Sequence, residues 1–236
     1  DHTFPRLVAD IGGTNARFSL ETSLYNYTHT KVLPCKDYKT LAHAAHAYLE
    51  SVGIEHIEYA AIALPTPIAG DKILMVNSPW DTFSIEETKL QLGLKNVVFL
   101  NDFHALALAI PHLSEEHLIK VGGVAADPYR PRGIIGPGTG LGVASLIRHP
   151  NGEYLAIPAE GGHSSFTPVN IEEVELWEFV HKRFHHVSFE RFVSGPGLQL
   201  IYEAVCDQKR FHISQMPSPA EITERALNQE CWICQT

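Results

Sequence analysis

Cysteine is scarce in this chain of 236 residues. Cys35, Cys206, Cys231 and Cys234 are its only four cysteines, too few and too far apart for the disulfide framework of a small secreted domain. Cys231 and Cys234 form one isolated Cys-x-x-Cys pair, whereas a zinc site of this kind needs a second pair. We therefore expect a protein of a reducing compartment, with a cytoplasmic location.

Long apolar runs are missing as well. No stretch approaches the roughly 18 consecutive apolar residues of a membrane-spanning helix; the longest, such as residues 60–64 and 105–110, suit a strand or a short helix. Residues 1–5 lack the basic head, apolar centre and cleavage site of a signal peptide. We expect no membrane partner.

Positive charge is the third shortage. The chain has 18 Lys and Arg against 27 Asp and Glu, a net charge of −9 with histidine neutral, which opposes attraction to nucleic acid. Its apolar content of 44% excludes intrinsic disorder, and its length suffices to bury a sizeable core. A globular protein that acts on small molecules is expected.

The first half of the sequence alternates strand and helix patterns. A short apolar strand at 7–9, a Gly12-Gly13 turn and an alternating segment at 16–20 predict a hairpin. The next predicted helix begins at Leu41, is capped by Thr40 and ends at Gly53. A strand is expected at 59–64, followed by a helix at 85–92 with Ser84 and Glu87 at capping-box spacing. A strand at 97–100 and a helix at 103–110 complete this half. This order predicts an α/β fold whose sheet mixes hairpins with crossovers.

The alternation of strand and helix patterns changes near Pro111, so we place a domain boundary there and expect domains at 1–110 and 111–236. In the second domain, Asn170 and Glu173 have capping-box spacing at the head of a helix predicted to run to about Phe184. Another helix is expected after residues 194–197.

Residues 10–15 form the first candidate site. The glycines of Asp10-Ile11-Gly12-Gly13-Thr14-Asn15 allow the backbone to approach an anion, and Thr14 and Asn15 add donors. The Asp10 carboxylate could hold Mg²⁺ directly or through water. The alternative is a Gly-Gly hairpin turn without a ligand.

A second glycine-rich stretch covers residues 136–142, with glycine at every other position and Thr139 among them. Such a loop offers several amide groups to a polyphosphate and few side chains to exclude it. A tightly turned connection is the alternative.

Asn101 and Asp102 directly follow the apolar strand at 97–100. A carboxylate at the carboxyl end of a strand in an open α/β sheet points into the crevice where ligands bind. There Asp102 could accept the proton of a hydroxyl that attacks a phosphoryl group. Alternatively, Asp102 caps the helix that follows.

The fourth candidate site consists of Glu160, His163 and Glu190. These side chains suit the hydroxyl groups of a sugar, which need several directional hydrogen bonds. Taken singly, each is more typical of a solvated charge or of one among 14 histidines.

Taken together, these motifs resemble those of the bacterial glucokinase family. The motifs are ADIGGTNAR at 9–17, LNDF at 100–103, GPGTGLG at 136–142, EGGH at 160–163, SGPG at 194–197 and ITERAL at 222–227. The resemblance implies an actin-like, ribonuclease-H-like ATPase fold with two domains around a cleft. It also implies phosphorylation of glucose on its 6-hydroxyl with ATP and Mg²⁺, by a homodimer. The cysteine-rich zinc motif of the related repressor, open-reading-frame and kinase group is missing.

The resemblance also implies roles for individual residues. Asp102 matches the catalytic base, and Asn101, Asp102, Glu160, His163 and Glu190 match the glucose ligands. The nucleotide-binding residues by this match are Ala9, Asp10, Ile11, Gly12, Gly13, Thr14, Asn15, Gly138, Thr139 and Gly140, with Asp10 also near the metal. A non-catalytic sugar-binding or regulatory protein, and a kinase that prefers another hexose such as mannose, remain as alternatives.

Members of this family continue beyond the position of Thr236, with a glycine-rich loop for adenosine and a terminal helix. We therefore expect that the chain is either a fragment or a variant without that segment.

Overall fold

A computed structural model describes residues 3–75, 78–80, 82–125, 127 and 129–236. The chain divides into two compact units, Asp1–Ile119 (unit 1) and Lys120–Thr236 (unit 2). The boundary expected near residue 110 falls at the short 3-10 helix η2 (Ile110–His112) of unit 1. Among the helices of the described residues, none combines the length and apolar character that crossing a membrane requires.

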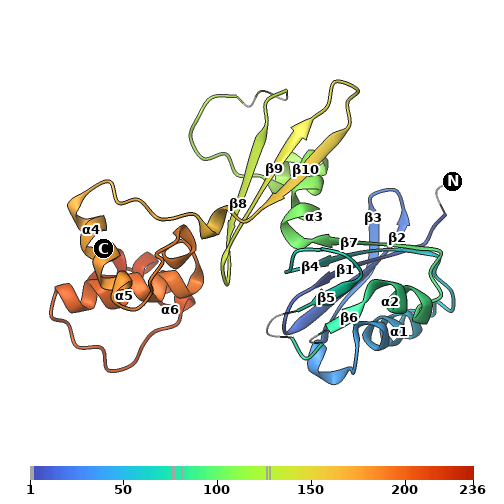
Figure 1. Cartoon of the computed structure of the whole chain (residues 1–236), viewed down its shortest axis with the longest axis horizontal. Coiled ribbons are helices and arrows are strands. Elements are labelled where there is room, and N and C mark those ends of the chain that lie inside the picture. The colour runs from blue at the N-terminus through green and yellow to red at the C-terminus, as the bar shows by residue number, and fades with distance from the viewer. Residues whose placement is uncertain (1–2, 76–77, 81, 126, 128) are drawn as a thin grey trace. The chain divides into compact units, whose positions relative to one another are not determined.

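Unit 1 is built on a five-stranded sheet (Figure 1). Its strands, in the order β3-β2-β1-β4-β7, are β3 (Asn26–Pro34), β2 (Asn15–Ser23), β1 (Arg6–Ile11), β4 (Tyr59–Leu64) and β7 (Asn96–Asn101). The first three strands pair antiparallel, whereas β4 and β7 run parallel to β1. The predicted mixture of hairpins and crossovers is therefore confirmed.

Helices α1 and α2 lie together on one side of this sheet in Figure 1. The remaining elements of unit 1 are η1 (Cys35–Asp37), α1 (Leu41–Ser51), β5 (Lys72–Leu74), β6 (Thr82–Ser84), α2 (Ile85–Gln91), α3 (Asp102–Ala109) and η3 (Glu115–His117). Thr40 caps α1 by accepting a hydrogen bond from the His43 amide at 3.2 Å, as predicted. Beyond the helix, Gly53 takes the left-handed conformation expected of it, with φ of 73°.

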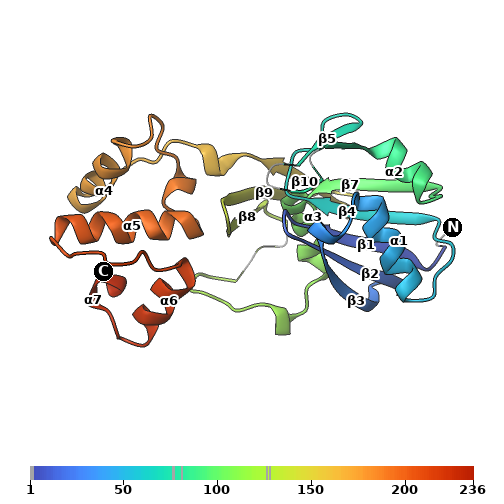
Figure 2. The same ribbon diagram turned by 90° about the horizontal axis from the view of Figure 1, so that it is seen from below.

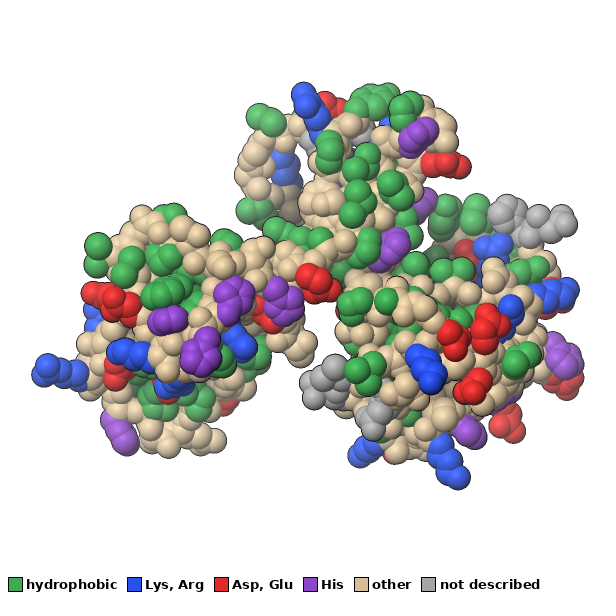
Figure 3. All heavy atoms as spheres, viewed as in Figure 1, with side chains coloured by type: hydrophobic (Ala, Val, Ile, Leu, Met, Phe, Trp, Pro, Cys, Tyr) green, Lys and Arg blue, Asp and Glu red, His purple; other side chains and the backbone are tan. Residues whose placement is uncertain are grey.

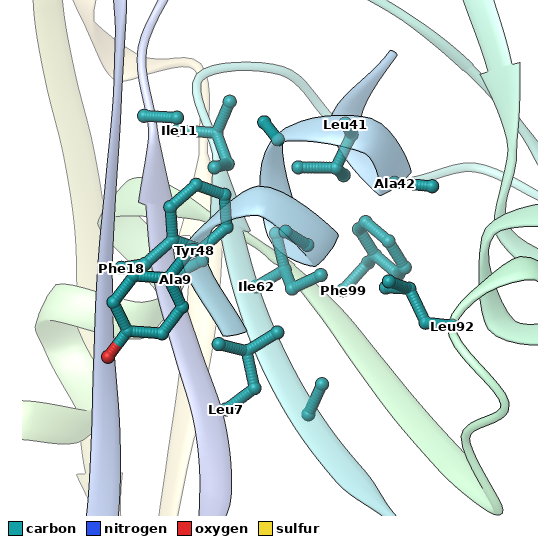
Figure 4. Close-up of a cluster of buried hydrophobic side chains, with 14 of the residues drawn as sticks. Leu7, Ala9, Ile11, Phe18, Leu41, Ala42, Tyr48, Ile62, Leu92 and Phe99 are labelled. Atoms are coloured by element: carbon teal, nitrogen blue, oxygen red, sulfur yellow. The ribbon is translucent and has the colours of Figure 1, made fainter. Parts of the chain in front are cut away.

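The core of unit 1 forms between the sheet and α1, because alternate residues of the strands point to this face (Figure 4). Leu7 and Ile11 of β1 and Ile62 of β4 are almost completely buried there. The Tyr48 ring of α1 stacks on Phe18 with 5.3 Å between ring centroids. Residues between the buried ones, Asp10 among them, therefore point to the opposite face of the sheet.

Unit 2 contains a three-stranded antiparallel sheet and a group of helices, of which α4, α5 and α6 lie side by side in Figure 2. The sheet order is β10-β9-β8, and the elements are β8 (Arg132–Pro137), β9 (Leu141–Arg148), β10 (Tyr154–Ala159), η4 (Gly161–His163), α4 (Ile171–His181), η5 (Phe189–Arg191), α5 (Gly195–Gln208), α6 (Pro219–Leu227) and α7 (Trp232–Gln235).

Two predictions for these helices need correction. Helix α4 ends at His181 rather than near Phe184, because the Arg183 amide donates to the Val180 carbonyl only three residues back, which tightens the last turn. The Phe184 amide shares that carbonyl. Asn170 does cap this helix, but the carboxylate of Glu173 accepts from the Val169 amide instead of completing the box.

A complete capping box occurs instead at the head of α6, and it was not predicted. Ser218 accepts from the Glu221 amide at 3.2 Å, and Glu221 in turn accepts from the Ser218 amide at 2.7 Å. Each member thus satisfies an amide that the first turn of the helix leaves unpaired.

One face of the three-stranded sheet is apolar and exposed. Its exposed side chains are Ile135, Ile147, Leu155 and Ile157, and the strand register places them on the same side. Figure 3 shows hydrophobic side chains gathered over β9 and β10.

Candidate functional site

The first glycine turn joins β1 to β2, as the sequence predicts. The Gly12 amide donates to the Asn15 carbonyl at 2.8 Å and closes the turn. Behind it, the buried Cys35 donates its amide to the Thr14 carbonyl at 2.8 Å and its thiol to the Gly12 carbonyl at 3.6 Å. The turn is therefore fixed from one side, while the side chains of Thr14 and Asn15 are exposed.

Asp10 lies just before this turn, with 62% of its side chain exposed. Arg17 is the residue opposite Asp10 in the β1–β2 pair, and its Nη1 atom lies 3.7 Å from Asp10 Oδ2. The described residues contain no group of three His, Cys, Asp or Glu suited to a metal. Mg²⁺, however, is commonly held by one or two carboxylates together with water and substrate phosphates, and an exposed carboxylate beside a glycine turn fits that mode.

Asn101 caps α3, so the alternative that Asp102 is the cap is wrong. Asn101 Oδ1 accepts hydrogen bonds from the amides of Phe103 at 3.0 Å and His104 at 3.2 Å. Asp102 is the first residue of the helix, and only its Oδ1 also accepts from the Phe103 amide, at 2.8 Å. The helix start thus uses Asn101 as its cap and does not depend on the Asp102 carboxylate for that purpose.

Asp102 is half-buried at the carboxyl end of β7. Burial raises the pKa of its carboxyl group, the negative charge of Asp10 raises it further, and the Phe103 amide partly opposes both effects. The influence of Asp10 connects the first glycine turn with the Asn101-Asp102 motif in unit 1.

The second glycine turn is shorter than the sequence motif that predicts it. Gly136 and Pro137 belong to β8 and Leu141 and Gly142 to β9, so the turn itself is residues 138–140. The Gly138 amide donates to the Gly140 carbonyl at 2.8 Å. Within the described part of the chain, the amides of Thr139 and Gly140 have no acceptor, so they remain available to an anion.

The head of α5 holds the same turn, a contact that the sequence pattern does not reveal. The amide of Gly195, the first residue of α5, donates to the Gly138 carbonyl at 2.8 Å. Ser194 caps the helix by accepting from the Gly197 amide at 3.0 Å.

Glu160, His163 and Glu190 come together in unit 2. His163 Nε2 lies 3.8 Å from Glu160 Oε2, and His163 Nδ1 lies 4.0 Å from Glu190 Oε1. Glu160 and His163 flank Gly162, which is buried so closely that a Cβ atom built on it would overlap the Leu141 carbonyl. The second oxygen of Glu190, Oε2, accepts from the Leu141 amide at 2.8 Å. These sugar-site candidates are therefore in direct contact with the end of the second glycine turn.

A cavity of about 740 Å³ adjoins that turn. It is lined by the turn itself, by the head of α5 and by one face of α6, including Gly138, Ser194, Leu198, Pro219, Thr223 and Leu227. Most of its wall is apolar. Sequence reasoning singled out residues 222–227 without giving them a role.

The predicted site residues thus form two sets. Asp10, the first turn, Asn101 and Asp102 lie in unit 1, whereas the second turn, Glu160, His163 and Glu190 lie in unit 2.

Comparisons with known proteins identify the family. A family model described as Glucokinase matches residues 7–236. The glucokinase of Neisseria gonorrhoeae is 47% identical over 231 residues, which are 98% of this chain and 70% of that protein. A solved glucokinase from an Antarctic psychrotroph is similar with a TM-score of 0.84 and 31% identity, over 99% of this chain and 74% of that one.

A more distant structure has the same fold. It is the glucokinase of Balamuthia mandrillaris, solved with glucose, with a TM-score of 0.78 and 21% identity over 98% of this chain and 71% of that one. The structural likeness thus accompanies a sequence match that spans nearly the whole chain. The chain has the α/β fold of the sugar kinases and belongs to the glucokinase family.

Proposed function

We propose that Asp102 is the general base in the ATP-dependent phosphorylation of glucose, the activity that membership of the glucokinase family assigns to this chain. The observation that carries the proposal is that Asn101, and not Asp102, caps α3. Asp102 contributes a half-buried carboxylate that does not serve as the cap.

In the proposed reaction, the Asp102 carboxylate accepts the proton of the glucose 6-hydroxyl as its oxygen attacks the γ-phosphorus of ATP. The new O–P bond forms while the bond to the β-phosphate oxygen breaks, and ADP leaves with that electron pair. The raised pKa of Asp102 favours this role, because a stronger base takes the proton more readily.

We assign the sugar-binding role to Asn101, Glu160, His163 and Glu190. Carboxylate and imidazole groups can accept from and donate to sugar hydroxyls in fixed directions. The distances of 3.8 and 4.0 Å from His163 to Glu160 and Glu190 support one shared site for these three residues in unit 2.

We assign the phosphates of ATP to the two glycine turns, where backbone amides face outward. The apolar cavity between α5 and α6 adjoins the second turn and would take the nucleoside. Asp10 would hold Mg²⁺, which neutralises phosphate charge when it is bound.

The wider arrangement is also part of the proposal. An actin-like, ribonuclease-H-like pair of domains would close over sugar and nucleotide and exclude water. The boundary between these domains would lie near residue 110, as the sequence predicts, or at residue 119, where unit 1 ends. We further propose a homodimer that works in the cytoplasm, where the four free cysteines would stay reduced.

The decisive experiment compares Asp102→Asn with the unchanged chain. We expect kcat for glucose 6-phosphate formation to fall on the order of 10²–10⁴-fold, while glucose affinity by calorimetry stays within a few fold. Asp207→Asn, at an exposed position outside the candidate site, is the matched control and should keep full activity.

An active Asp102→Asn enzyme would refute the role of Asp102. Glucose binding by the unchanged chain without any glucose 6-phosphate would instead favour the non-catalytic alternative. Comparison of kcat/KM for glucose and mannose decides between hexoses.

A further inference from the structure

The two carboxylate oxygens of Glu190 serve different neighbours. Oε1 is turned toward His163, with 4.0 Å to its Nδ1 atom. Oε2 accepts a hydrogen bond of 2.8 Å from the Leu141 amide, at the point where the second glycine turn enters β9. Only 30% of the Glu190 side chain is exposed, so water competes weakly for this charge-assisted bond.

The segment that carries Glu190 holds both ends of the turn. Glu190 binds the Leu141 end through its side chain, and Gly195 binds the Gly138 end through its amide. Ser194 stiffens the connection between them by donating to the Glu190 carbonyl at 2.7 Å. The turn at residues 138–140 is therefore framed by one short stretch of chain, η5 and the start of α5.

The fit of Glu190 against the turn also explains the glycine at position 140. A Cβ atom built on Gly140 would overlap the Glu190 carboxylate. Since the φ of Gly140 lies outside the range that favours glycine, a side chain here would be opposed by the close approach of the Glu190 carboxylate rather than by backbone conformation. A side chain at position 140 would have to displace the carboxylate from the Leu141 amide.

We propose that Glu190 is a positioning residue that sets the conformation of the phosphate-binding turn and couples sugar binding to nucleotide binding. This inference rests on the proposed function, in which Glu190 is a sugar ligand and the turn binds phosphate. A sugar hydroxyl that binds Oε1 fixes the carboxylate in place. The same carboxylate then holds the Leu141 amide, so the turn is better ordered for ATP when glucose is bound.

The test measures ATP·Mg²⁺ affinity by calorimetry, with and without glucose, for the unchanged chain, Glu190→Ala, Glu190→Gln and Glu160→Gln. Without glucose, Glu190→Ala should weaken ATP binding roughly ten-fold, the cost of a lost hydrogen bond to a charged group. Glu190→Gln keeps an acceptor and should lose less. Glu160→Gln is the matched control, because Glu160 faces His163 but has no hydrogen bond to the turn; it should weaken glucose binding and leave ATP binding unchanged.

The effect of glucose on ATP affinity distinguishes this coupling from a merely structural role of Glu190. Glucose should tighten ATP binding in the unchanged chain and have no such effect in Glu190→Ala. Gly140→Ala should weaken ATP binding by itself but add little in the Glu190→Ala background, where the carboxylate is gone.

Hydrogen exchange of the Leu141 amide gives a readout that needs no ligand. It should be protected in the unchanged chain and exchange faster in Glu190→Ala. Equal exchange in both, or equal ATP affinity of both without glucose, would overturn the positioning role. An unchanged chain that binds no ATP would refute the proposed function itself, and with it this coupling, even if Leu141 exchange responds to the substitution.

Discussion

Asp10 and Arg17 face each other across the first two strands, with 3.7 Å between Arg17 Nη1 and Asp10 Oδ2. The guanidinium offsets part of the charge of Asp10, and that charge in turn acts on Asp102. Three charged residues of unit 1, on β1, β2 and the first turn of α3, are therefore electrostatically connected.

Replacing Asp10 by Asn should lower the pKa of Asp102. Burial would still raise this pKa, but the repulsion between the two carboxylates would be gone. The measurement is a titration of the Asp102 carboxyl carbon by NMR without metal or substrate, so the outcome does not depend on any role of Asp10 in catalysis. An unchanged or higher pKa would contradict the connection.

Replacing Tyr48 by Phe should destabilise unit 1 by about 1 kcal/mol. The ring would keep its stacking on Phe18, but the hydroxyl, which donates to the His29 carbonyl at 3.0 Å, would be lost. Burial raises the pKa of Tyr48 to about 12, so this donor persists across the ordinary pH range. Urea unfolding measures the difference, and Tyr129→Phe, at a largely exposed position, should change stability by less than about 0.5 kcal/mol.

Replacing Glu203 by Gln should destabilise unit 2 by up to about 1 kcal/mol near neutral pH, since the pair is partly exposed to solvent. Arg183 donates two hydrogen bonds of 2.6 Å to Glu203, which lower the pKa of Glu203 from its ordinary 4.5. A lowered pKa gives stability that is present above pH 4.5 and is lost as the pH falls through the folded-state pKa. The difference in unfolding free energy between the two proteins should therefore shrink below that pH; a constant difference would contradict the ion pair.

The four thiols should differ in their reaction with iodoacetamide. Burial raises the pKa of Cys35 and of Cys206, which slows alkylation of both. Burial acts the same way on Cys231, but the backbone amide and thiol of Cys234 and the amide of Ile233 outweigh it and lower the pKa of Cys231. Peptide mass spectrometry over time should find Cys231 labelled first and Cys35 only after denaturation; early labelling of Cys35 would show that the first turn opens.

Local patterns were sufficient to predict most elements that position the candidate site. The hairpin around Gly12, the helix after Thr40 and the strands at 59–64 and 97–100 follow from alternation, caps and turn residues, which act over a few positions. Helix ends were less predictable. The end of α4 depends on how the carbonyl of Val180 divides its hydrogen bonds, which no residue type encodes.

Contacts between distant segments were beyond sequence reasoning. Glu190 and Leu141 are 49 residues apart, and nothing in either motif indicates their hydrogen bond. The same holds for Gly195 and Gly138. At residues 101–102, both Asn and Asp are good caps, so only the backbone geometry decides that Asn101 serves as the cap.

The packing of Gly162 against the Leu141 carbonyl limits how the substrate range of this protein could be altered by laboratory evolution. A library randomised at position 162 should return almost only the parental codon, because every larger residue would push η4 away from β9 and carry Glu160 and His163 with it. Libraries intended to change the sugar should instead vary exposed neighbours such as Ser164 and Ser165, where a longer side chain would extend into solvent rather than against the backbone.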